Sequence, residues 1–245
     1  MSDTTPHTTT VPQDSLRAPT RLASMYFDIR ERVIGAAVML DDDRLATRVP
    51  ACPDWTVRGL VAHLVAMPMA IVAGEIPEAV MGGGDPTAWL AQLVDEHQHR
   101  TIAELARWWA SDDDALAATL GNAGLLLADL FTHESDLHGA IGSTAHRNTP
   151  ELDSQIDAAM AGLQKDIAAA DLPPIAVDDG TERRVSADGP PGWTLHTGFW
   201  EAHRVFNSRR TPEEVLDIPH EGDPSIYFDV MHHHLPFPAA SLGER

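Results

Sequence analysis

Apolar side chains recur every three to four positions through most of residues 17–172, which is the period of amphipathic α-helices. Capping residues and chain breakers divide this pattern into helices joined by short connections, as in a helical bundle. We expect a first helix from Arg17 to Met39 and a second that begins after Asp54, with Asp54 or Thr56 as its N-cap. A third should run from Asp85 to Trp109, and a fourth should follow Asp112–Asp114 and end near Gly142. A fifth should run from Thr149 to about Pro173.

The pattern changes in the last part of the chain. Short strand-like runs begin at Ile175, Arg183 and Trp193 and are separated by Asp-Asp-Gly and Gly-Pro-Pro-Gly turns. Further helices are expected around Phe199–Asn207 and from Thr211 and Asp223. The sequence therefore predicts a mainly α protein in three parts: a disordered leader over residues 1–16, a helical bundle over residues 17–172 and a small C-terminal α+β subdomain over residues 173–245.

Charge and cysteine content narrow the class of partner. The formal net charge is −20, which argues against nucleic acids and anionic membrane surfaces, because both bind through basic patches. Cys52 is the only cysteine, so an intramolecular disulfide is impossible, and Met1–Gln13 lacks the basic and apolar segments of a secretory signal. We expect a cytoplasmic protein with small-molecule partners. The sequence does not decide between a monomer and a homodimer.

Candidate chemistry is concentrated in the fourth expected helix. Asp129 and His133 are four residues apart, so they share one helix face, and Asp129 lies in an apolar run where an unpaired carboxylate is costly. His63, in the apolar second helix, is the natural third donor. Two imidazoles and a carboxylate suit Zn²⁺ or a related divalent ion and leave a coordination position open, as in catalytic sites. We predict a metal site made by His63, Asp129 and His133.

Other interpretations of these residues remain open at the level of sequence. A histidine in a helix is more often a hydrogen-bonded core or surface residue than a ligand, and Asp129 can pair with an arginine such as Arg58 or Arg107 instead. Rival pairs also exist. Asp95 and His99 are four apart but lie in polar surroundings, and the adjacent histidines His232–His234 would point in different directions on a helix.

Two motifs resemble those of the mycothiol-dependent maleylpyruvate isomerase family, which includes mycothiol S-transferase-like members and belongs to the DinB-like metal-binding four-helix bundles. The first is Cys52-Pro-Asp-Trp-Thr-Val-Arg-Gly-Leu-Val-Ala-His63, which follows the family pattern through the histidine ligand. The second is Asp129-x-x-x-His133-x-x-Asp136, where the family usually has glutamate in place of Asp129. Aspartate is one methylene shorter, so the resemblance implies an ion closer to this helix or a weaker site.

The resemblance implies a function. It suggests a DinB-like four-helix bundle in which a divalent metal, most simply Zn²⁺, activates mycothiol as a thiolate for S-transfer to a small electrophile or for thiol-assisted isomerisation. Arg209 and Arg210, in a segment similar to the family's C-terminal Arg-Arg-Ser, are candidates for binding a carboxylate of the substrate or thiol, with salt bridges to Glu213 or Glu214 as the alternative. A catalytically inactive binding or regulatory module and a thiol-independent metal hydrolase are the alternative functions.

Overall fold

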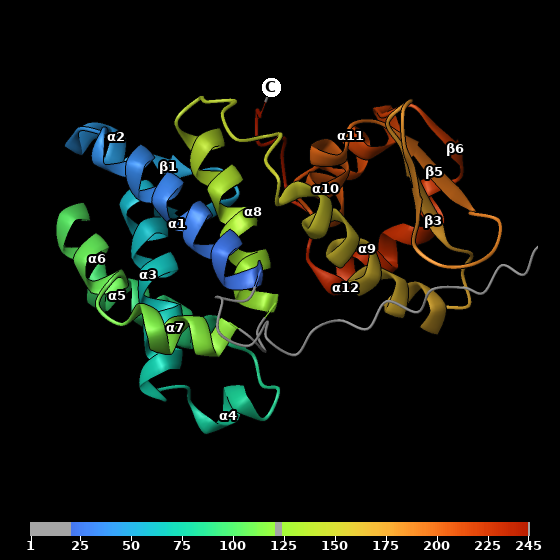
Figure 1. The fold of residues 1–245 in the computed structure, drawn as a ribbon. Helices are drawn as coiled ribbons and strands as arrows, with labels where there is room; N and C mark the ends of the chain where they lie inside the picture. Colours follow the sequence, from blue (N-terminus) through green and yellow to red (C-terminus); the bar gives the residue numbers. More distant parts are fainter. Residues whose placement is uncertain (1–20, 121–123, 245) are drawn as a thin grey trace, which may run out of the picture.

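The computed structural model describes residues 21–120 and 124–244, which form a helical bundle beside a smaller unit built on a mixed sheet (Figure 1). The predicted fold class, mainly α with a small C-terminal α+β part, is confirmed. The predicted leader, residues 1–16, lies outside the described residues.

Helix α3, Val57–Ala73, occupies the centre of the bundle. Its sequence is apolar on nearly every side and most of its residues are buried, as expected of a helix surrounded by others. Thr56 begins the helix, because its side chain accepts a hydrogen bond from the backbone N–H of Gly59, and Gly74 ends it in a left-handed conformation. The helices around it are α1 (Arg21–Val38), α5 (Thr87–His97), α6 (Ile102–Trp109), α7 (Asp113–Leu120) and α8 (Gly124–Ala140).

Two of the expected helices are each divided in the structure. The third becomes α5 and α6, because Thr101 and Glu104 form a reciprocal capping box that starts a new helix. The fourth becomes α7 and α8, whose axes differ by 107° across residues 121–123, which lie outside the description. Both Asp129 and His133 lie within α8, so the division leaves the predicted pair on one helix.

Short elements that the hydropathy pattern did not predict flank α3. Before its start lie α2 (Asp42–Leu45), β1 (Arg48–Val49) and β2 (Cys52–Thr56), and after its end lies α4 (Glu78–Met81). Strands β1 and β2 pair antiparallel, and β2 runs directly into α3. This connection places Trp55 beside the first turns of the central helix.

The C-terminal unit is built on a four-stranded sheet in the order β4-β3-β5-β6. Its strands are β3 (Ile175–Asp178), β4 (Arg183–Val185), β5 (Trp193–His196) and β6 (His220–Gly222). Strands β3 and β5 are parallel, whereas the two outer pairings are antiparallel. The remaining helices are α9 (Leu152–Ala169), α10 (Phe199–Phe206), α11 (Pro212–Asp217), the 3₁₀ helix η2 (Pro224–Tyr227) and α12 (Phe228–His234).

Helix α9 packs mainly against the C-terminal elements. Its inward residues, such as Ile156 and Leu163, share an apolar cluster with Trp193 and Tyr227, and its principal neighbours are α10 and α12 (Figure 1). The domain limits at residues 17, 172 and 245 stay a prediction. Within the described residues, no single helix is long and apolar enough to span a membrane; α7 and α8 meet that criterion only as a bent pair, by length and composition.

Candidate metal centre

His63 lies on the second turn of α3 and is 1% exposed. Neither of its ring nitrogens has a hydrogen-bond partner among the described residues, which is uncommon for a buried imidazole. The indole of Trp55 stacks on its ring, with centroids 4.6 Å apart and planes 30° apart. The ring therefore packs against an aromatic side chain, and its nitrogens are left to face groups from other helices.

Asp129 and His133 approach His63 from α8, where they lie one turn apart. The Nε2 atom of His63 is 3.3 Å from Asp129 Oδ2, and the Nε2 atom of His133 is 3.5 Å from Asp129 Oδ1. One donor atom from each of the three side chains lies within 4.8 Å of the others. The structure thus brings together the three residues that the sequence singled out.

The carboxylate of Asp129 and the neighbouring histidines stabilise each other's charged forms. Burial alone would raise the pKa of Asp129, but the neighbouring His133 and His63 outweigh it and lower that pKa. Burial would lower the pKa of His133, yet Asp129, Asp136 and Cys52 raise it to about 10. Without a metal ion the carboxylate is therefore ionised and shares its charge with a histidine.

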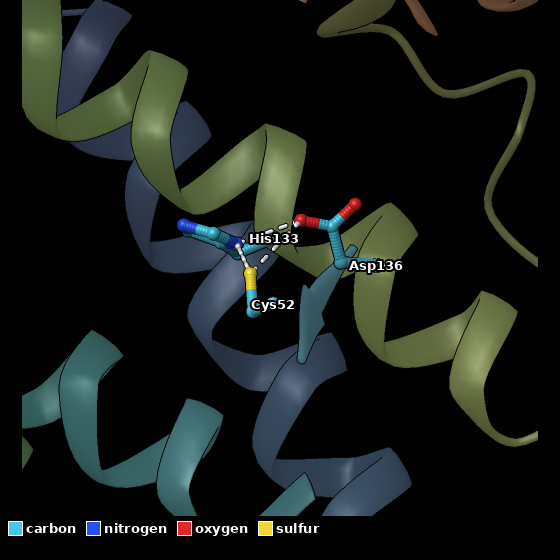
Figure 2. A group of neighbouring side chains, drawn as sticks. All are labelled: Cys52, His133 and Asp136. Carbon is cyan, nitrogen blue, oxygen red and sulfur yellow. Dashed lines mark hydrogen bonds and ion pairs between the residues drawn. The ribbon is translucent and has the colours of Figure 1, made fainter. Parts of the chain in front are cut away.

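The opposite edge of the His133 ring faces Asp136 and Cys52 (Figure 2). Since nearby arginines hold the pKa of Asp136 well below its usual range despite its burial, this carboxylate accepts the hydrogen bond from His133 Nδ1, at 2.8 Å. The Sγ atom of Cys52 is 3.9 Å from the same nitrogen and 4.0 Å from Asp136 Oδ2. With Nδ1 engaged in this way, Nε2 of His133 carries a lone pair directed at Asp129 whenever the ring is neutral.

Two arginines hold Asp136 in place. Arg204 Nη2 is 2.6 Å from Asp136 Oδ1, and Arg209 Nη2 is 2.9 Å from Asp136 Oδ2. Arg204 is fully buried. It also donates hydrogen bonds to the backbone oxygen of Thr132 and to the carboxylate of Glu244. A network from the C-terminal unit therefore fixes the orientation of a bundle histidine.

The donor set fits a divalent cation. His63 offers two unpartnered buried nitrogens, Asp129 Oδ2 is likewise buried without a hydrogen bond, and His133 presents Nε2 because its other nitrogen is bonded to Asp136. Imidazole and carboxylate ligands at this spacing, with a carboxylate behind one histidine, are the usual composition of such sites. The ion would be held by His63, Asp129 and His133.

Two cavities meet at this group. The first is about 330 Å³ in volume and is lined by Cys52, Trp55, Thr87, Leu90, His63 and His133 among others. The second is about 480 Å³ and lies between α8, α9, α10 and α12, with Arg209, His203 and Asn207 in its wall. Asp129 and His133 line both cavities, so ligands could approach the group from two sides.

The other sequence candidates lie in different places. Arg209 lines the second cavity and pairs with Asp136, whereas Arg210 pairs with Glu201 and Glu244 instead of Glu213 or Glu214. Arg58 pairs with Asp42, and the side chain of Arg107 bonds to the backbone of its own helix, so neither reaches Asp129. The rival carboxylate Asp95 bonds to Gln98, and the side chains of residues 233 and 234 are outside the description.

Several residues around the group were not identified from sequence. Trp55 lies in the motif that ends at His63, just before the α3 cap, yet the motif alone does not show that its ring reaches the imidazole. Thr87, the first residue of α5, lines the first cavity because α5 packs against α3. Arg204 and His203 carry no sequence signal, because only the docking of α10 brings them to α8.

Comparison with known proteins gives a family match for the N-terminal part. Residues 26–125 match the family model of the mycothiol maleylpyruvate isomerase N-terminal domain. This part of the chain is similar to that domain. The domain contains His63, while Asp129 and His133 follow its last matched residue. The chain has no match among curated protein sequences.

The fold is similar to two crystal structures of a mycothiol-dependent maleylpyruvate isomerase. The structure of a histidine-to-alanine mutant has a TM-score of 0.54 and 11% identity, over 83% of this chain and 93% of that one. The other structure has a TM-score of 0.50 and 11% identity, over 78% of this chain and 90% of that one. At this identity the likeness establishes the fold of the chain and leaves its reaction to be argued from the site.

Proposed function

We propose that this protein is a metal-dependent enzyme that uses a low-molecular-weight thiol, mycothiol, to modify a small electrophile. The observation that carries the proposal is the convergence of His63, Asp129 and His133 at the junction of two cavities, with buried nitrogen and oxygen atoms that make no hydrogen bond within the described part of the chain. The domain family and the names of the two similar structures support mycothiol as the thiol.

The metal, most simply Zn²⁺, supplies electrophilic assistance when bound, since it lowers the pKa of a thiol and favours the thiolate at neutral pH. The protein's own residues do the positioning. Asp136 fixes the ring of His133 and its tautomer, and Trp55 stacks on the ring of His63 where it also lines the first cavity. Trp55, Leu90 and Ala91 give the first cavity an apolar wall beside the candidate ligands.

Two cavities suit a reaction with two small molecules. Arg209 lines the second cavity. Its Nε and Nη2 donate to Asp136 and its Nη1 donates to the backbone oxygen of Asn207, so a carboxylate of the substrate or thiol would bind through the remaining N–H groups of the two terminal nitrogens. Arg210 is occupied by Glu201 and Glu244, so we assign the substrate-facing role to Arg209 and a structural role to Arg210. A thioether product would identify S-transfer, whereas recovery of the free thiol with a rearranged substrate would identify isomerisation.

Metal analysis combined with a thiol-transfer assay tests the proposal. We expect purified wild-type protein to bind a stoichiometric divalent ion and to accelerate the reaction of mycothiol with monochlorobimane, and a chelator to abolish the acceleration. His133→Ala should lose the ion of this centre and the activity, while the matched control His99→Ala, which removes an exposed histidine after α5, should keep both. Absence of the ion from the wild type, or the same metal content in His133→Ala, would contradict the metal centre.

The same assay distinguishes the alternative functions. Bound metal with no thiol-dependent activity towards a panel of electrophiles would favour a binding or regulatory module. This alternative is considered because the chain has aspartate at position 129, where the family usually has glutamate. Activity that persists without thiol would favour a metal hydrolase. The proposal also includes a cytoplasmic location, which rests on the single cysteine.

A further inference from the structure

His138 is a second buried histidine whose polar atoms are unused. It lies near the end of α8, is 6% exposed, and has no hydrogen-bond partner at either ring nitrogen among the described residues. Burial, His146 and Arg32 lower its pKa to about 4, so its ring is neutral near pH 7 and offers a lone pair to a cation. A buried imidazole without a partner loses its hydration and gains nothing in return, unless a ligand binds there.

His146 approaches His138 from the connection between α8 and α9. The two ring centroids are 5.1 Å apart and the planes are inclined at 57°. His146 is exposed and has a positive φ of 62°. Solvent therefore has access to the pair from one side.

Glu134 completes the group one turn before His138 on the same face of α8. Its two oxygens are 2.7 and 3.0 Å from Arg32, which also contacts Glu151 at 3.3 Å. These three groups carry one net negative charge, and each carboxylate oxygen of Glu134 has a second lone pair beyond the one that Arg32 uses. The residual charge favours a cation beside the two imidazoles.

We propose that Glu134, His138 and His146 form a second divalent-metal site, separate from the one made by His63, Asp129 and His133. Donor atoms of the three side chains lie within 4.8 Å of one another. A tetrahedral ion with bonds of about 2.0–2.1 Å needs donors roughly 3.3 Å apart, so a bound ion would draw these side chains closer together. Two imidazoles and one carboxylate select a borderline ion such as Zn²⁺ over Mg²⁺ or Ca²⁺.

The position of this site indicates a structural role. The connection that carries His146 runs from the end of α8 to α9 and joins the bundle to the C-terminal unit (Figure 1). His138 also lines a small cavity of about 10 Å³, which has room for about one water molecule. A bound ion would tie this connection to the bundle.

Titration of chelator-treated protein with Zn²⁺, against a competing chromophoric chelator, tests the second site. We expect two tightly bound ions in the wild type, one in His146→Ala, one in His63→Ala and none in the double variant. His99→Ala is the control and should bind two. Since His146 is exposed, its substitution leaves the fold in place.

Limited proteolysis supplies a second readout. Zn²⁺ should slow cleavage within residues 141–151 in the wild type and in His63→Ala, and should have no effect on that cleavage in His146→Ala. One ion in the wild type that is lost in His63→Ala and kept in His146→Ala would overturn the second site while leaving the first intact. Two ions in both the wild type and His146→Ala would overturn it as well.

Discussion

His133 and Asp136 form a buried hydrogen bond of 2.8 Å between Nδ1 and Oδ2, which connects the candidate metal centre to the C-terminal unit. Asp136 is at the same time bound by Arg204 of α10 and by Arg209. The orientation of a histidine in the bundle therefore depends on how the C-terminal unit docks.

Asp136→Asn tests this dependence. An amide can present a donor to His133 Nδ1 and no longer fixes the tautomer that leaves Nε2 free, so we expect Zn²⁺ affinity to fall about 10- to 100-fold. Two arginines would also lose a buried counter-charge, which should reduce the free energy of unfolding by about 3–5 kcal/mol. Chelator competition, measured in a His146→Ala background, gives the affinity.

The control for that variant is Glu201→Gln, which removes a carboxylate from Arg210 away from the centre. It should leave Zn²⁺ affinity unchanged. If Asp136→Asn lowers stability but binds Zn²⁺ as tightly as its parent, Asp136 has only a structural role.

Asp129 is the predicted ligand that differs from the glutamate usual in the family. Asp129→Asn keeps the shape of the side chain and removes its charge, so Zn²⁺ should no longer stabilise the protein; Asp129→Glu should restore the effect. At Zn²⁺ concentrations near 100 times Kd, bound ion contributes about 2.7 kcal/mol, which raises Tm by about 5–10 °C for a chain of this size. Thermal denaturation in a His146→Ala background measures this centre alone.

Asp95→Asn provides the matched control for that measurement, because it removes an exposed carboxylate that bonds only to Gln98. Its Zn²⁺-dependent rise in Tm should equal that of the parent. An equal rise in Asp129→Asn would show that Asp129 is not a ligand.

The local periodicity of the chain was enough to predict the fold class and most helices. It failed where a cap interrupts a continuing apolar pattern: Thr101 and Glu104 start α6, although apolar positions continue on both sides. It also failed for β6, whose residues His220–Gly222 are polar and become a strand only by pairing with β5. Such pairing is a tertiary effect that no local pattern contains.

The candidate site was predictable to the extent that its residues share helix faces. Asp129 and His133 are one turn apart, so their proximity follows from helical geometry. Arg204 is 68 residues from Asp136 in sequence, and their ion pair depends on how α10 packs against α8. The second cavity lies where α10 packs beside α8 and α9, so the sequence could not predict it either.

Trp55 stacks on His63 and lines the first cavity, so its substitution should affect the binding of substrate more than the binding of metal. Loss of an aromatic contact of about 0.5–1.5 kcal/mol predicts a KM for the electrophile that is raised up to about 10-fold in Trp55→Ala, with kcat and Zn²⁺ content close to the wild type. Trp55→Phe retains a ring and should recover most of the loss. A fall in Zn²⁺ content in Trp55→Ala would show instead that the indole holds His63 in its ligand orientation.

His203 is buried on α10 between charged neighbours. Its ring packs edge-on against Phe131 at 4.9 Å, and its Nε2 atom is 3.1 Å from Asn207 Nδ2. Burial, followed by Arg204 and Arg209, lowers its pKa from 6.5 to about 3, while Asp136 opposes the shift. The folded protein therefore keeps this histidine neutral at pH values where the unfolded chain protonates it.

Protonation of His203 should make the protein acid-sensitive. Because the unfolded state binds the extra proton between its pKa of 6.5 and the folded value of about 3, stability falls as pH decreases through this window, by about 2 kcal/mol between neutral pH and about pH 5. His203→Leu removes the titrating group, so its free energy of unfolding should fall by about 2 kcal/mol less over the same range. Urea denaturation at a series of pH values measures both slopes. Parallel curves for the two proteins would mean that His203 titrates alike in the folded and unfolded states, and the acid sensitivity would then belong to other groups.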